Sequence, residues 1–370
     1  MQSKSIGIVC TSRGFGGLEI NTLKLCRYLL NYGWRVRLLV NAAGTMYQQA
    51  TEYASDIATV QSLGDNKLSK AVLRKWLSSH SVAILLTPYN KDIAALSGYK
   101  RWNNRSVKLV YQQHMQVGVS KRDFIHTLRY NMLDAWISPL EYLKQETISK
   151  TKVPADKIAV IPFGLEPDRL VNASLSMNEA RQQLQLPQDV SLIGVLGRID
   201  PKKGQDFLIR ALAKIPDHYH LLIVGDVTPN EGEEFLNHLH HLVKQNNLQE
   251  RVHFQKNQKD VSRFFSAIDV FAMPSHGETY GMVTLEAMLS GVPVIGVNRD
   301  GTAELLQHGK LGWLHNLEDI NGFINQLRLL QSDPALLSKL SAARDEVIAK
   351  YNIDDMMKAT DELLSGLLYK

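Results

Sequence analysis

Short apolar runs alternate with amphipathic stretches along the first part of the chain. The run Ile6–Thr11 is continuous, as in a strand buried on both faces, and Leu18–Leu30 carries apolar residues at helical spacing. Further runs of strand length are Val36–Val40, Ala83–Leu86, Lys108–Tyr111, Ala135–Ser138 and Ile158–Ile161. Repeated strand–helix–strand order predicts a parallel sheet with helices on both of its faces.

The alternation pauses at residues 162–167, where Pro-Phe-Gly-Leu-Glu-Pro is typical of a linker. It restarts with apolar runs at Ser191–Leu196, Leu221–Val224, Val252–Phe254, Asp269–Ala272 and Val294–Val297. Two such blocks predict an α/β protein of two Rossmann-like, doubly wound parallel-sheet domains, residues 1–165 and 166–352. Parallel α/β sheets bind ligands at the carboxyl ends of their strands, so we expect a site in a central cleft between the domains.

The last stretch, residues 353–370, predicts an amphipathic helix. Its apolar residues lie near one stripe and are Ile353, Met356, Met357, Leu364, Leu367 and Leu368. The periodicity does not identify the surface that this helix covers.

The composition is that of a globular protein, with 44% hydrophobic and 21% charged residues in 370. The two cysteines, Cys10 and Cys26, are expected to be small buried side chains rather than a disulfide framework. The first residues lack the pattern of a signal peptide, and no apolar run approaches the ~18 residues of a membrane span. We therefore expect a cytoplasmic protein.

The net charge of +5 conceals an asymmetry between the two predicted domains. Residues 1–165 hold 22 Lys and Arg against 10 Asp and Glu, whereas residues 166–370 hold 20 against 27. Two basic stretches of the first domain, Lys70–Leu77 and Ser120–Met132, also carry apolar or aromatic residues. Such stretches fit either an anionic membrane surface or solvated helix faces. Nucleic acid is a poorer partner, because no aromatic platform or known binding motif is present.

A glycine-rich segment, residues 14–19 (Gly-Phe-Gly-Gly-Leu-Glu), follows the first predicted strand and opens the first helix. Glycines there allow backbone amides to approach an anion at a helix N-terminus, although a tight turn alone would also explain them. A dinucleotide fingerprint is not favoured, because Glu19 replaces its third glycine and Asn41 stands where an acidic residue is expected.

Two cations follow the first strand of the second domain. Arg198 and Lys203 leave the carboxyl end of this strand within the segment 197–204, Gly-Arg-Ile-Asp-Pro-Lys-Lys-Gly. Arginine offers a planar fork to phosphate oxygens and lysine offers a point charge, so both can neutralise a diphosphate. Each residue taken alone also fits an ordinary solvated loop.

Two acidic residues, Glu278 and Glu286, are spaced eight positions apart around the start of a predicted helix, residues 283–290. Glu286 interrupts an apolar segment, where a carboxylate needs a partner or a hydroxyl-rich ligand, although an ordinary exposed position on the helix fits it equally well. The amides of Gly281 and Met282 at the helix start are a second candidate anion site.

Taken together, these motifs resemble retaining glycosyltransferases of family 4, which have the GT-B fold and include bacterial lipopolysaccharide and exopolysaccharide enzymes. The resemblance covers nearly the whole chain and depends on the order of its motifs: Gly16-Gly17, Gly197-Arg198, Lys203-Gly204, Glu278 with Glu286, 290–295 (Ser-Gly-Val-Pro-Val-Ile) and 301–304 (Gly-Thr-Ala-Glu).

The resemblance implies a role for each matching residue. Arg198 and Lys203 would neutralise the leaving diphosphate, Glu278 would contact the transferred sugar, and Glu286 would hold the ribose hydroxyls. Donor contacts are also implied for Gly16, Gly17, Thr279, Tyr280, Gly281 and Met282, and a position beside the sugar for His114, whose local match is loose. It further implies that the last helix packs on the first domain.

The implied activity is metal-independent, retaining transfer of a hexose-type sugar from a nucleotide-diphosphate sugar, expected to be a UDP-sugar, to a glycan or lipid-linked acceptor. No D-x-D motif in a plausible loop and no metal-ligand spacing is found, so no cofactor is expected. Asp300 and Lys256 replace glycines of the family pattern, which leaves the donor open. A nucleotide-sugar 2-epimerase of the same fold and a noncatalytic nucleotide-sugar-binding protein are the alternatives. The enzyme would be cytoplasmic, or peripheral on the inner face of the cytoplasmic membrane.

Overall fold

The structure is a computed structural model of the chain. It describes residues 4–14, 16–50, 53, 56–61, 63, 67–166, 170, 175–227, 233–256 and 260–369, with only the backbone at 67 and 68. The chain divides into unit 1, residues 1–164 with 353–370, and unit 2, residues 165–352. The expected domains place this boundary one residue later.

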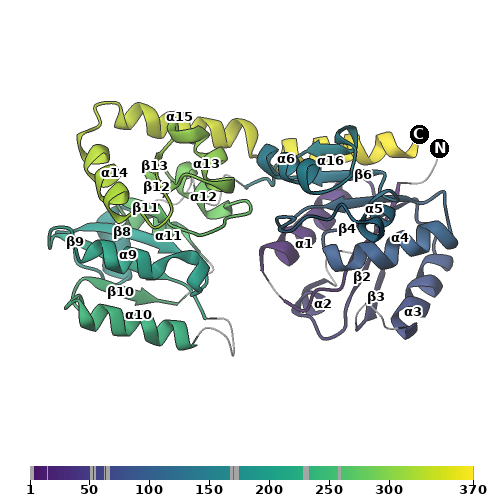
Figure 1. Cartoon of the computed structure of the whole chain (residues 1–370), viewed down its shortest axis with the longest axis horizontal. Helices are drawn as coiled ribbons and strands as arrows, with labels where there is room; N and C mark the ends of the chain where they lie inside the picture. Colours follow the sequence, from purple (N-terminus) through teal and green to yellow (C-terminus); the bar gives the residue numbers. More distant parts are fainter. Residues whose placement is uncertain are drawn as a thin grey trace. The chain divides into compact units, whose positions relative to one another are not determined.

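Unit 1 is built on a sheet of seven described strands, all parallel, in the order β3-β2-β1-β4-β5-β6-β7 (Figure 1). The strands are β1 (Ser5–Cys10), β2 (Arg35–Asn41), β3 (Asp56–Val60), β4 (Ile84–Thr87), β5 (Lys108–Gln112), β6 (Ala135–Ser138) and β7 (Ile158–Val160). The helices are α1 (Gly17–Asn31), α2 (Thr45–Gln49), α3 (Lys67–Ser78), α4 (Ile93–Trp102), α5 (Phe124–Tyr130), α6 (Glu141–Lys150) and α16 (Ile353–Leu368), with 3-10 turns η2 (Asn90–Asp92) and η3 (Ala155–Lys157).

Both faces of this sheet are covered, which explains why its strands are apolar without alternation. Along β1, Ile8 packs into a core with α1 and α16, whereas the next residue, Val9, packs into a core with α3 and α4. Every residue of β1 is buried. Cys10 and Cys26 are buried free thiols, as expected.

The last helix, α16, belongs to unit 1, in agreement with the family pattern (Figure 1). Its apolar stripe enters the same core as Ile8, and Met357 and Leu364 are fully buried there. The Asp361 carboxylate accepts hydrogen bonds from Trp34 Nε1 at 2.6 Å and from Lys4 Nζ at 2.9 Å.

Unit 2 has six described strands, also parallel, in the order β10-β9-β8-β11-β12-β13. The strands are β8 (Ser191–Leu196), β9 (Tyr219–Val224), β10 (Val252–Gln255), β11 (Val270–Met273), β12 (Val294–Val297) and β13 (Trp313–His315). The helices are α8 (Met177–Gln183), α9 (Gln205–Leu212), α10 (Glu233–Gln245), α11 (Ser262–Ala267), α12 (Met282–Leu289), α13 (Asp300–Leu305), α14 (Ile320–Ser332) and α15 (Leu336–Lys350), with 3-10 turns η4 (Pro201–Lys203) and η5 (Gln307–Gly309).

The segment expected to be a linker is where the chain passes from unit 1 into unit 2. It pairs there with the residues at which the chain returns to unit 1. The Leu165 amide donates to the Tyr351 carbonyl at 2.7 Å, and Leu165 forms a parallel bridge with Asn352. The last linker residue, Pro167, lies outside the described residues.

Candidate active site

The loop after β8 is fixed by close backbone packing and by a buried glutamine. A side chain on Gly225, after β9, would place its Cβ 1.9 Å from the Gly197 carbonyl oxygen, so the two loops can touch only without one. Gln205, which is fully buried at the start of α9, donates from Nε2 to the Arg198 carbonyl at 2.8 Å. Sequence reasoning missed Gln205, whose only signal is its position directly after Lys203-Gly204.

Lys203 reaches a carboxylate that is 75 residues distant in sequence. Its Nζ donates to Glu278 Oε2 at 2.8 Å, and the side chains are 28% and 16% exposed. The pair forms because β8 and β11 are neighbours in the sheet, so the loops after them meet at the carboxyl edge. Arg198 lies on the same loop with its side chain 66% exposed, 3.9 Å from Asp200.

The turn that carries Glu278 is held against the start of α13. The Gly301 amide donates to the Glu278 carbonyl at 3.1 Å, and a Cβ on Gly301 would lie within 3.1 Å of the carbonyl oxygens of Glu278, Thr279 and Tyr280. Gly281 caps α12 in the left-handed region, φ 93°, which favours glycine. Glu286 lies half-buried on α12, one turn after Met282. The predicted site residues of the second domain therefore lie on the loops after β8 and β11 and on α12.

The glycine segment of unit 1 opens α1, and one of its amides bonds to a side chain of this helix. Gly16 N–H donates to the Glu19 carboxylate at 2.8 Å, within the first turn of the helix. Gly17 is the first residue of α1, and beyond its chain neighbours and the helix backbone no atom of the described residues lies within 4 Å of the place where a Cβ would be. Internal packing therefore does not require glycine at Gly17. The neighbouring Phe15 lies outside the described residues.

His114 follows β5 and packs against Phe163, with the ring centroids 4.5 Å apart. Burial lowers the pKa of His114 to about 3, so its imidazole is neutral at physiological pH. Its Nε2 is buried without a hydrogen-bond partner among the described residues. The ring can exchange a hydrogen bond with a ligand, but it cannot supply a positive charge.

Asp92 lies beneath the glycine segment and was not identified from the sequence. It accepts hydrogen bonds from the Thr11 amide at 2.9 Å and from Thr11 Oγ1 at 2.5 Å. Burial, opposed by these two bonds, raises the pKa of this carboxyl to about 7. Asp92 therefore holds a proton in the folded protein at pH values where the unfolded chain has released it.

This buried carboxyl predicts that the free energy of unfolding of unit 1 falls as the pH rises from about 4 to 7. Asp92→Asn should remove that dependence. The change that it causes in the free energy of unfolding should therefore be about 2–3 kcal/mol more stabilising at pH 8 than at pH 5. Denaturant unfolding of both proteins at pH 5 and pH 8 measures the difference. An equal effect of the substitution at the two pH values would contradict the assignment.

Among the residues that the structure describes, no group of three or more His, Cys, Asp or Glu side chains is arranged to hold a metal ion. No helix within the described ranges is both long enough and apolar enough to span a membrane.

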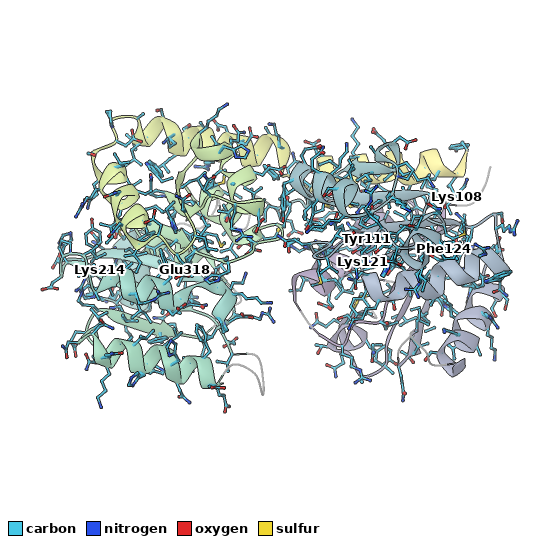
Figure 2. The ribbon with its side chains drawn as sticks, viewed as in Figure 1. Lys108, Tyr111, Lys121, Phe124, Lys214 and Glu318 are labelled. Carbon is cyan, nitrogen blue, oxygen red and sulfur yellow. The ribbon has the colours of Figure 1, made fainter. Side chains whose placement is uncertain are left out.

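The two basic stretches of the first domain contribute to one groove in unit 1. It has a volume of about 410 Å³, and its charged or aromatic lining residues are Lys70, Arg74, Lys91, Tyr99, Trp102 and Arg129. Trp76, the aromatic residue of the first stretch, lies in the core instead, where it is 6% exposed and its Nε1 donates to Asp56. Beside the groove, α5 exposes Phe124 (labelled in Figure 2) and Ile125, which are 79% and 56% accessible.

Two family models match the chain in succession. The model of glycosyltransferase family 4 matches residues 15–169, and that of glycosyl transferases group 1 matches residues 176–347. Together they account for most of both units.

Curated relatives are similar over part of their length. The chain is 29% identical over 239 residues to a D-inositol 3-phosphate glycosyltransferase of Stackebrandtia nassauensis, covering 61% of this chain and 53% of the relative. It is 32% identical over 187 residues to the lipopolysaccharide core biosynthesis glycosyltransferase LpsE of Rhizobium meliloti, covering 50% and 53%. The chain thus spans about half the length of the curated relatives it matches.

Solved structures are similar over both units. A glycosyltransferase from Rickettsia africae superposes with a TM-score of 0.88 at 20% identity, covering 100% of this chain and 99% of the other. Anabaena HepE, solved in complex with UDP, gives 0.85 at 21% identity, covering 98% and 100%. At these identities the likeness shows the fold, which is GT-B.

Proposed function

We propose that this chain, which belongs to the glycosyltransferases of group 1 and family 4, transfers a sugar from a nucleotide-diphosphate sugar to a hydroxyl group. The observation that carries the proposal is the contact between Lys203 and Glu278 at the carboxyl edge of the unit 2 sheet. It places a cation beside the turn that opens α12, where a diphosphate and its sugar can be held together.

The chemistry assigned to these residues is departure of the diphosphate. The bond between the anomeric carbon and the diphosphate oxygen breaks, the acceptor oxygen bonds to that carbon, and the acceptor proton passes to the departing phosphate. Negative charge grows on the leaving oxygen, so Lys203, Arg198 and the amides at the α12 start stabilise the transition state. Attack on the face that the leaving group vacates would retain the configuration, and fixed cations would make a metal unnecessary.

The donor is proposed to be a UDP-hexose. The UDP complex of HepE, a protein of the same fold, supports the choice of UDP. Glu286 would hold the ribose, and Thr279, Tyr280, Gly281 and Met282 would contact phosphate and sugar through their backbone. In unit 1 we assign a donor contact to Gly17 and, to neutral His114, a hydrogen bond with the sugar.

The acceptor is proposed to be a glycan or a lipid-linked glycan of the cell surface. The relative LpsE, a glycosyltransferase of lipopolysaccharide core biosynthesis, supports this class. The D-inositol 3-phosphate glycosyltransferase is comparably similar in sequence. A screen of acceptors should therefore include small phosphorylated compounds, and transfer to one of them in place of a glycan would contradict the proposed acceptor class.

A thermal-shift panel of nucleotide sugars, each with and without EDTA, tests the proposed donor. A bound donor raises the unfolding temperature by mass action, and UDP-hexoses should give the largest rise, unchanged by the chelator.

The selected donor is then incubated without acceptor. Conversion to an epimer would identify an epimerase, whereas binding with neither hydrolysis nor transfer to any acceptor would identify a noncatalytic protein. Loss of binding or transfer in EDTA would refute metal independence.

Peripheral binding to an anionic membrane is proposed for the groove and α5 of unit 1. The groove gathers Lys70, Arg74, Lys91 and Arg129, and none of the described residues that line it is acidic. Trp102 is 75% exposed at its rim, and Phe124 is exposed on α5. Cations beside exposed aromatic side chains fit an anionic lipid surface, to which each cation contributes about 1 kcal/mol.

The membrane proposal predicts that the protein sediments with vesicles containing phosphatidylglycerol at low salt and is released by high salt. Phe124→Ser should weaken binding about tenfold, because the ring no longer enters the lipid interface. Leu337→Ser is the matched control, since Leu337 is 81% exposed on α15 of unit 2. Equal sedimentation with phosphatidylcholine vesicles, or an equal loss in the control, would rule out this surface.

A further inference from the structure

Asp300, the first residue of α13, adopts a left-handed backbone conformation, which residues with a side chain adopt less readily than glycine does. Its φ is 52°, in the left-handed region where glycine is free of strain. Other described residues share this feature, but Asp300 directly precedes Gly301, whose amide holds the Glu278 turn. Strained residues persist where the surrounding structure holds them, often at functional sites.

The Asp300 carboxylate lies beside the segment that leads into Glu278. Its Oδ2 is 3.9 Å from the place where a Cβ on Gly277 would be, and its side chain is 19% exposed. It accepts a hydrogen bond from Arg299 Nε at 2.9 Å. The carboxylate is thus near the turn to which the transferred sugar is assigned, and part of it is accessible.

A purely structural role for Asp300 is the support of α13 through the helix dipole. That role accounts for a negative charge at the first turn but not for φ 52°, which a glycine would adopt at no cost. Because the carboxylate is partly accessible and lies beside the segment that leads into Glu278, it can itself contact a ligand.

We propose that Asp300 determines the class of donor sugar, an inference that rests on the proposed function. Its carboxylate accepts hydrogen bonds from hydroxyl groups and repels a second carboxylate, so neutral hexoses bind and uronic acids are excluded.

Calorimetric titration of UDP, UDP-glucose and UDP-glucuronate into the full chain tests this inference without an acceptor. The wild type should bind UDP-glucose at least about tenfold more tightly than UDP-glucuronate, the size expected for one like-charge contact. Asp300→Asn should reduce that ratio to about threefold or less, because it removes the repulsion and frees Arg299. Affinity for UDP itself should change by less than about twofold.

Asp300→Gly separates the two roles, because it removes the carboxylate and relieves the strain together. It should lose discrimination while the unfolding temperature rises. Asn247→Gly is the matched control: Asn247 has φ 54° on the surface after α10, so its substitution should raise stability and leave discrimination unchanged.

The outcomes separate this inference from the proposed function. If the wild type does not bind UDP, the proposed donor is wrong, and the role assigned to Asp300 is wrong with it. Binding of UDP with the same sugar preference in the wild type and both Asp300 variants overturns the inference alone. A lower unfolding temperature in Asp300→Gly with unchanged preference assigns Asp300 to the support of α13.

Discussion

Lys203→Ala is expected to lower the turnover number by about 10²–10³-fold while the fold is kept. The ammonium is held 2.8 Å from Glu278, so it is positioned before the diphosphate begins to leave. Loss of one such preorganised charge typically costs this factor in rate. The pair is partly exposed and contributes about 1 kcal/mol or less to stability, so the unfolding temperature should change little.

Lys202→Ala is the matched control for Lys203, because it removes an adjacent cation from the same 3-10 turn. The Lys202 side chain is exposed and makes no described ion pair, and the substitution should leave turnover nearly normal. The double variant Lys203→Ala/Glu278→Gln tests whether the unpaired carboxylate alone repels the donor. Near-normal turnover in Lys203→Ala, or full recovery in the double variant, would refute the leaving-group role.

The strands buried on both faces were all predicted from the sequence. β1 and β8 are continuous apolar runs because helices cover each side of the sheet, and such runs stand out from the surrounding sequence. β3 and β13, which were not predicted, are edge strands: β3 is half-buried over most of its length and β13 has three residues. Neither segment stands out from its neighbours, although the other two edge strands, β7 and β10, were predicted from apolar runs of similar length.

For the last helix, periodicity predicts the helix itself but not the surface on which it packs. Its stripe predicts an amphipathic helix, but the partner surface depends on contacts such as Trp34 with Asp361, 327 residues apart. Nothing local encodes that pairing, and only the resemblance to the family gave the correct unit for α16.

The candidate site divides in the same way. Lys203 and Glu278 could be proposed because charged residues directly after strands of a parallel sheet lie at its ligand-binding edge. Their contact could not, since it requires β8 and β11 to be neighbours, and strand order is not contained in periodicity. Gln205 and Asp92 act on backbone groups beneath the loops, so they resemble ordinary polar residues until the structure shows their partners.

Gly17→Ala is expected to lower turnover about 10²-fold without loss of stability. Apart from its chain neighbours and the backbone of α1, no atom of the described residues lies within 4 Å of the added methyl group, and alanine favours a helix more than glycine does. The methyl group would instead occupy the space through which a donor phosphate approaches the helix start. A displacement of about 1 Å at a reacting group is sufficient for such a loss.

Two other glycines provide opposite controls for Gly17. Gly366, inside α16, is also free of neighbours within 4 Å, so Gly366→Ala should raise the unfolding temperature and leave turnover unchanged. Gly225→Ala should destabilise unit 2 by about 1–3 kcal/mol or more, because its Cβ would clash with the Gly197 carbonyl and displace the loop of Lys203. Steady-state kinetics and thermal unfolding of the three variants distinguish a glycine required by a ligand from one required by packing. Normal turnover in Gly17→Ala would refute the donor contact that is assigned to Gly17.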